Sequence, residues 1–320
     1  MLYEFALLPE VIEEAVTNPD TSHQRELIEL LKRVRENAML VDTDYGAWSN
    51  RVKHVIERVS TEGGSYHAEI TTLLRDLMKH HRIVRHRLTE NQVADDWLQQ
   101  AEIIRGICRF DGILAPPSLC LYLSELPDYY HPFPHPPGQI GRTNWHGRRS
   151  RSTRKCRAEF ESALDAVLRH AQRADLVDPY INCEERRYQQ TLELCVELLS
   201  KNHAEKPQLV IHTSPMRSNH TTKNWKASWS DYFQRVPASR PLTLRAYCWK
   251  GTPTERFHNR YVFTDQGVGL SIPHGLDCHE PNSASSDIWQ MMDVEEAQRE
   301  WTKFTSAPVY DLDAKVRVER

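Results

Sequence analysis

The chain has 320 residues, of which 39% are hydrophobic and 27% charged, and its formal net charge is -3 at pH 7. This composition supplies enough apolar side chains for a packed core and excludes an intrinsically disordered chain, while the length fits one large domain or two ordinary ones. The near balance of charge excludes an indiscriminate nucleic-acid coat but leaves room for a local basic patch.

The sequence predicts a cytoplasmic protein with no membrane span. It contains no run of about 18 apolar residues, and Glu4 and Glu10 lie where a secretory signal would be basic and then uninterruptedly apolar. The seven cysteines form no CxxC pair, which argues against a zinc ribbon or a disulfide framework and favours a reducing compartment.

Residues 1–128 are predicted to form the smaller, N-terminal α/β domain. Apolar residues at helical spacing predict amphipathic surface helices over residues 24–37 and 68–81. Short runs of β-branched or aromatic residues predict buried strands at residues 2–8, 38–42, 82–87 and 110–115.

Three acidic residues of this domain, Asp42, Asp44 and Asp111, are expected at the ends or edges of these strands. Carboxylates placed there could gather Mg²⁺, and the strand and helix order faintly resembles PIN-like nucleases. Asp is also common in turns, and the histidines of the segment KHHRIVRHR share no face of a helix or strand, so we predict no metal site.

Residues 129–152 are predicted to be a Pro-rich and basic linker, because prolines at this density interrupt helices and central strands. Its basic end continues to Arg157 and could bind a polyanion or be a solvated charge run. The candidates for phosphate contact there are Arg148, Arg149, Arg151, Arg154 and Lys155.

Residues 153–307 are predicted to form a second α/β domain, followed by a tail at 308–320. Its predicted helices cover residues 156–174, 184–201, 224–236 and 293–306. Its predicted strands cover residues 174–181, 208–215 and 242–251, with two more inside 256–275 around a Gln266-Gly267 turn. This alternation predicts a mixed sheet covered by helices on both faces, with ligands at the strand ends.

The segment HNRYVFTD, from His258 to Asp265, carries the most specific chemistry. Residues two apart in a strand share a face, so His258 and Arg260 are expected to project together. An imidazole can attack phosphorus or shuttle a proton, and a guanidinium can hold the nonbridging oxygens of a phosphate.

This segment resembles the signature of the phospholipase D superfamily, H-x-K-x4-D-x6-G-S-x-N. His258 takes the histidine position, Arg260 the lysine position and Asp265 the aspartate position. Residues 272–275, Ile-Pro-His-Gly, occupy the G-S-x-N slot, where His274 could partly replace the lost polar groups. The resemblance spans residues 155–305 and implies a phospholipase D-like half.

The resemblance implies that His258, Arg260 and Asp265 are catalytic, and that no metal or other cofactor is needed. Active members combine two motifs, one histidine acting as nucleophile and the other as general acid, whereas this chain has one H-x-R-x4-D motif. A homodimer would therefore complete the site. Proteins of this single-motif kind are commonly encountered in bacterial defence or mobile elements, and we expect a phosphodiester-engaging, nucleic-acid-directed protein.

Two alternatives remain open. The fold could serve as a noncatalytic interaction subunit of a larger complex, or it could bind phospholipid head groups.

Further candidates for substrate binding lie at strand ends or on a predicted helix. Asp178, Tyr180, His212 and Thr213 are expected on the same side of the sheet as His258. Asp-Pro-Tyr is also an ordinary strand terminator. Lys223 and Lys226, with Trp225 and Trp229, could contact nucleic-acid phosphates and bases, although tryptophans four apart on a helix also suit a core.

Overall fold

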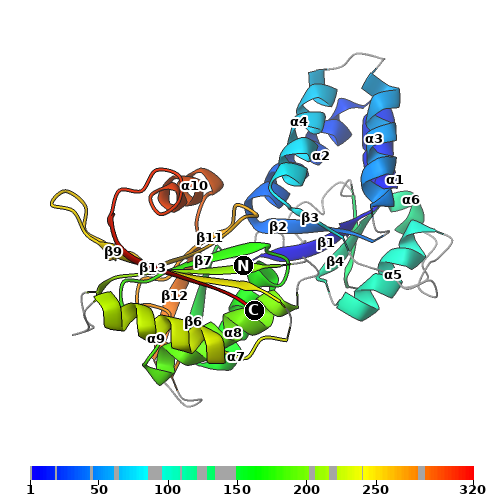
Figure 1. Cartoon of the computed structure of the whole chain (residues 1–320). Helices are drawn as coiled ribbons and strands as arrows, with labels where there is room; N and C mark the ends of the chain where they lie inside the picture. The colour runs from blue at the N-terminus through cyan, green and yellow to red at the C-terminus, as the bar shows by residue number, and fades with distance from the viewer. Residues whose placement is uncertain are drawn as a thin grey trace. The chain divides into compact units, whose positions relative to one another are not determined.

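The structure is a computed structural model that describes residues 2–18, 20–43, 46–60, 65–85, 96–108, 110–120, 128–133, 149–201, 206–215, 222–239, 241–279 and 285–320. The chain divides into two compact units, residues 2–147 and 148–320 (Figure 1). The boundary falls inside the segment that the sequence predicts as a linker. Both units combine helices with a sheet, which confirms the predicted α/β class.

The described part of the first unit is built on a parallel sheet in the order β3-β2-β1-β4-β5. Its strands are β1 (Tyr3–Leu7), β2 (Ala38–Asp42), β3 (Ile83–Arg85), β4 (Gly112–Ala115) and β5 (Tyr130–Pro132). Its helices are α1 (Pro9–Thr17), α2 (Thr21–Asn37), α3 (Ala47–Ser60), α4 (Ser65–Lys79), α5 (Trp97–Cys108) and α6 (Pro117–Cys120).

The four strands and two helices predicted for this unit are confirmed as β1 to β4, α2 and α4. Helix α3 lies outside the predicted elements, although its buried Trp48, Val52 and Val55 have the spacing of one helix face. Together with the sheet and the other helices, these side chains form the core of the unit.

The described part of the second unit is built on a mixed sheet in the order β13-β9-β8-β7-β10-β11-β12-β6. Its strands are β6 (Ser150–Arg154), β7 (Arg173–Val177), β8 (Gln208–Thr213), β9 (Thr243–Lys250), β10 (Tyr261–Thr264), β11 (Gly269–Ser271), β12 (Ser286–Met291) and β13 (Asp311–Glu319). Its helices are α7 (Arg157–Leu168), α8 (Arg186–Ser200), α9 (Thr222–Arg235) and α10 (Val294–Thr302).

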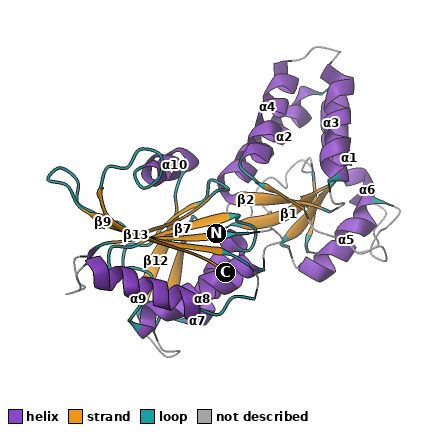
Figure 2. Cartoon of the chain, viewed as in Figure 1, coloured by secondary structure: helices purple, strands orange, loops and turns teal. Residues whose placement is uncertain are grey.

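Helices cover both faces of this sheet, as predicted. Helices α7, α8 and α9 lie on one face and α10 lies on the other (Figures 1 and 2). On the face of α10 an aromatic core packs against the sheet and includes Phe257, Phe304 and Tyr310. This core anchors the chain on either side of α10.

Two segments expected outside the sheet are strands at its edges. Residues 308–320, expected as a tail, contain β13, which pairs with β9 along the whole strand. Residues 150–152, expected as the end of the linker, belong to β6, which pairs with β12. Both strands are rich in charged or hydroxyl side chains, and an edge strand tolerates these because one of its sides faces no partner strand.

The order of strands brings several chain segments together where strands end. Strands β7 and β8 are parallel, so their carboxyl ends lie along the same edge of the sheet, which differs from the lateral edges formed by β6 and β13. Strand β10 runs antiparallel to β7, with Tyr261 opposite Val177, so the residues before β10 meet the residues after β7. Asp178 and Arg260 therefore come together.

Candidate functional site

Arg260 is held by three groups at this edge of the sheet. Its Nε lies 3.4 Å from Oδ1 of Asp178, and its Nη1 donates to the carbonyl oxygen of Pro273. The guanidinium carbon also lies 4.7 Å from the centre of the Tyr180 ring. The structure thus brings together Asp178, Tyr180 and Arg260, three of the predicted site residues.

Asp178 is fully buried, and its carboxylate organises the backbone around Arg260. Its Oδ1 accepts from the Tyr180 backbone N–H at 2.8 Å, and its Oδ2 accepts from the Leu276 backbone N–H at 3.1 Å. Burial raises the pKa of Asp178, while these two hydrogen bonds and Arg260 oppose the rise. Asp178 therefore acts first as a structural anchor for the loop after β11.

Gly275 allows this loop to pass close to the cluster. Its φ of 96° lies in the region that favours glycine. A Cβ there would lie 3.0 Å from Oδ2 of Asp178 and 3.3 Å from Nε of Arg260. A larger residue would push the loop away from both side chains.

His258 is exposed on the segment that leads into β10, not in the strand itself. The expectation that it lies in a strand is wrong, because β7 ends at Val177 and Pro179 has no N–H to continue the ladder. Its Nδ1 lies 2.9 Å from the carbonyl oxygen of Arg256. A carbonyl only accepts, so Nδ1 carries the proton and the lone pair of a neutral ring is on Nε2.

The resemblance implies that Asp265 acts at one site with His258 and Arg260, but Asp265 lies at the opposite end of β10. Its Oδ1 accepts from the backbone N–H groups of Gln172 and Arg173, at the start of β7. Five residues of extended strand span about 16 Å, which separates Asp265 from Arg260. Asp265 therefore fixes the entry to β7.

His274 forms a pair with Asp287, a residue outside the predicted site. Nδ1 of His274 lies 2.8 Å from Oδ1 of Asp287, and the His274 backbone N–H donates to Oδ2 at 2.9 Å. The His274 side chain is 74% exposed, whereas that of Asp287 is 2% exposed. A buried carboxylate thus orients an exposed imidazole.

A second cluster supports the loop that carries His274. Lys155 is buried, and its Nζ donates to the His274 carbonyl oxygen at 2.8 Å and to Oδ1 of Asp277 at 2.5 Å. Nε2 of His279 lies 2.9 Å from Oδ2 of the same carboxylate. Lys155 is therefore a structural cation and not a solvated member of a basic patch.

The described arginines of the basic stretch also pair with acidic residues. Arg149 lies 2.5 Å from Asp293, and Arg151 and Arg154 lie 3.2 and 3.0 Å from Glu159. Arg148 lies outside the described residues. These pairs reduce the positive field that the sequence alone would assign to this segment.

The remaining predicted side chains belong to the core or lie on α9. His212 is buried, with Nε2 2.8 Å from Asp175 and Nδ1 accepting from Trp249 Nε1 at 3.0 Å, so it is a core histidine. The buried Thr213 hydroxyl donates to a backbone carbonyl, and Trp225 and Trp229 are buried as well. Lys223 lies exposed on α9.

The carboxylates proposed to gather Mg²⁺ in the first unit do not come together. Asp42 ends β2, whereas Asp111 precedes β4, where it accepts from the Glu4 backbone N–H at 2.7 Å. All strands of this sheet are parallel, so the two residues lie at opposite edges. Asp44 lies outside the described residues. The described side chains contain no group of three His, Cys, Asp or Glu residues that could hold a metal ion.

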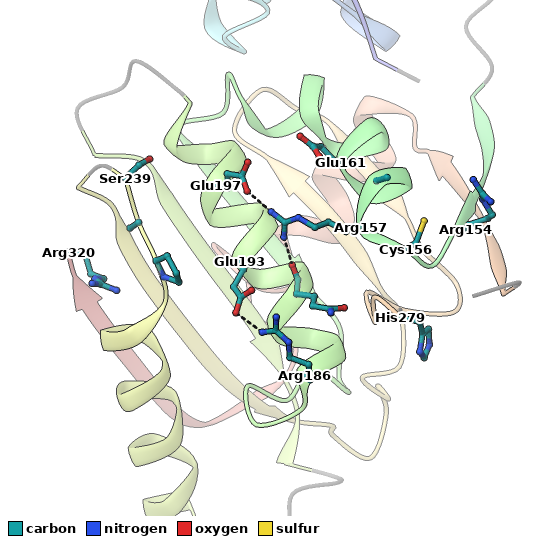
Figure 3. Close-up of a pocket in the computed structure, with 14 residues that line it drawn as sticks. Arg154, Cys156, Arg157, Glu161, Arg186, Glu193, Glu197, Ser239, His279 and Arg320 are labelled. Carbon is teal, nitrogen blue, oxygen red and sulfur yellow. Dashed lines mark hydrogen bonds and ion pairs between the residues drawn. The ribbon is translucent and has the colours of Figure 1, made fainter. Parts of the chain in front are cut away.

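A groove of about 1180 Å³ lies over α7 and α8 (Figure 3). Inside it Arg157 pairs with Glu197 at 2.5 Å, and Arg186 pairs with Glu193 at 3.1 Å. Of the cluster that supports the His274 loop, His279 lines this groove. His258, Arg260 and His274 are not among the residues that line the groove.

Comparisons with known proteins leave the family open: no family model matches the chain, and no curated protein matches it. None of the helices in the described ranges is long and apolar enough to cross a membrane.

Proposed function

We propose that the second unit engages a phosphodiester of a nucleic-acid strand at the edge formed by His258, Arg260 and His274. The observation that carries the proposal is the state of His258. Its Nδ1 is held by the Arg256 carbonyl, so Nε2 is the ring nitrogen that remains for a ligand, two residues before the cationic Arg260. An exposed imidazole with an acceptor nitrogen, two residues from a guanidinium, suits attack on a phosphate held by that guanidinium.

A polymeric substrate fits this site better than a small enclosed ligand. His258 is exposed and His274 is 74% exposed, so both rings lie on an open edge. Small-molecule sites are usually concave and enclose most of the ligand, whereas a strand can pass across an open edge. The resemblance to single-motif nucleases of the phospholipase D superfamily supports the same substrate class.

The test is cleavage of fluorescent single-stranded and double-stranded DNA and RNA oligonucleotides by the full chain, with and without EDTA. We expect cleavage that EDTA does not inhibit, because a histidine nucleophile requires no Mg²⁺. His258→Ala should abolish it, whereas His54→Ala, which changes an exposed histidine on α3, should not. Cleavage that survives His258→Ala and is lost with EDTA would overturn the proposal.

Binding without hydrolysis is the second candidate, and the contacts of Arg260 favour it. Asp178 and Pro273 already engage Nε and Nη1, so less of the guanidinium is free for a transferring phosphate. A wild-type protein that binds the oligonucleotides in a salt-dependent way but leaves them intact would support this role.

A further inference from the structure

His274 and Asp287 form a second site of proton chemistry beside His258. Displacement at phosphorus by a histidine requires an acid for the leaving oxygen as well as the nucleophile. We propose that His274, oriented by Asp287, is this general acid, so that one chain holds both functions. The inference rests on the proposed phosphodiester chemistry.

The contacts of Asp287 fix both the ring and the backbone of His274. One carboxylate oxygen lies 2.8 Å from Nδ1 and the other accepts from the backbone N–H at 2.9 Å. A carboxylate accepts from Nδ1–H, which leaves Nε2 as the nitrogen that exchanges a proton with solvent or substrate. In the Ser-His-Asp triad a buried acid orients the catalytic imidazole in the same way.

The burial of Asp287 distinguishes this pair from an ordinary surface contact. Asp287 lies on β12, whose side chains alternate between exposed and buried, and it points to the buried face with Trp289. Its other hydrogen bond comes from the Ile288 backbone N–H at 2.7 Å. Among the described residues, His274 is its titratable partner. A buried carboxylate, Asp287, therefore orients one exposed imidazole ring, His274.

The loop contacts join the residues just before His274 to Arg260. Arg260 Nη1 donates to the carbonyl oxygen of Pro273, the residue before His274, and the Ile272 backbone N–H donates to the Arg260 carbonyl at 3.0 Å. His258 precedes Arg260 by two residues on the neighbouring segment. Both histidines thus lie on segments that meet at Arg260, the candidate phosphate ligand.

The reaction balances with water as the second substrate. Nε2 of His258 forms a bond to phosphorus while the bond from phosphorus to the leaving oxygen breaks, and His274 Nε2–H gives its proton to that oxygen. Water then attacks phosphorus, His274 takes its proton, and the bond from phosphorus to His258 breaks. The products are a phosphomonoester and an alcohol, and both histidines return to their starting states.

The test compares two esters that differ in how much the leaving oxygen needs a proton. An oligonucleotide releases an alkoxide, whereas thymidine 5′-(4-nitrophenyl phosphate) releases nitrophenolate, which leaves without one. In a single turnover, His274→Ala should slow release of the leaving group from the oligonucleotide by about 10²- to 10⁴-fold, the usual effect of a general acid, and from the nitrophenyl ester by less than about 10-fold. Asp287→Asn should show the same split to a smaller degree, and His258→Ala should abolish both reactions.

The outcomes separate the two proposals. A wild-type chain that cleaves neither ester would overturn the proposed function and this inference with it. A wild-type chain that cleaves both, with His274→Ala slowing the two equally or neither, would overturn the inference alone. His54→Ala is the matched control, and thermal melting checks that each variant is folded.

Discussion

At the scale of single residues, the pair of Asp178 and Arg260 shows how the structure reassigns motif residues. The motif suggests that Arg260 is free for phosphate, yet its Nε lies 3.4 Å from a fully buried carboxylate. A buried ion pair contributes little by itself, but removal of one partner leaves the other charge buried without compensation. Arg260 is therefore structural as well as a candidate phosphate ligand.

Arg260→Ala should lower the free energy of unfolding by about 3 kcal/mol at pH 7. Burial already raises the pKa of Asp178, and loss of Arg260 would raise it further. A carboxyl whose folded pKa is raised stabilises the fold below its unfolded pKa and loses that contribution as pH rises through the folded value. The deficit of the variant should therefore shrink between pH 7 and pH 4.5, as measured by urea denaturation.

The matched control is Arg154→Ala, which removes a side chain that is 63% exposed and paired with Glu159. An exposed pair contributes little to stability, so this variant should remain close to wild type. Equal deficits for Arg260→Ala at the two pH values would show that Asp178 does not titrate as burial requires.

At the scale of elements, β13 is the largest departure from expectation in the second unit. Its sequence, DLDAKVRVE, contains mostly charged residues, so it lacks the apolar run of a buried strand. The burial of its side chains alternates only weakly along the strand: Ala314 is buried and Lys315 is exposed. Its pairing with β9 and its contact with α9 determine its conformation.

Ala314→Asp should strongly destabilise the second unit, because it places an unpaired carboxylate in a position that is 3% exposed. We expect a loss of about 3 kcal/mol or more in the free energy of unfolding. Lys315→Asp, on the exposed side of the same strand, should change it by less than about 0.5 kcal/mol. Chemical denaturation of both variants gives the measurement, and identical stabilities would mean that residues 308–320 behave as the tail expected from the sequence.

At the scale of the whole molecule, the two proposals differ in the number of chains that contribute residues to one site. A single H-x-R-x4-D motif predicts a homodimer that shares two copies of His258, and this stays a prediction. The pair of His274 and Asp287 provides a different source for the second histidine, within the same chain.

Mixing wild-type chains with His258→Ala chains distinguishes the two arrangements. If each chain holds a complete site, phosphodiesterase activity should fall linearly with the wild-type fraction after the chains have exchanged. A site shared across a dyad makes mixed dimers inactive, so activity would fall as the square of that fraction. The oligomeric state is measured on the same samples, because a complete site in each chain gives a linear fall in activity both in a monomer and in a dimer.

The sequence by itself determined the α/β class, the central strands of both units, the helices of the second unit, and α2 and α4 in the first unit. Helix α8 and strand β8 show why: each carries its pattern of buried residues within a short window, and that pattern is local.

Only the tertiary structure decided which of these residues meet. Asp178 lies 82 residues before Arg260 in the chain, and Asp287 lies 13 residues after His274, separations at which no local pattern reports contact. Asp265 is near His258 in the motif but far from it in space, because an extended strand separates its ends by the greatest distance that the backbone allows. The pairing of β10 with β7 and of β11 with β12 fixed these relations, since hydrogen bonds between strands join partners that are remote in the sequence.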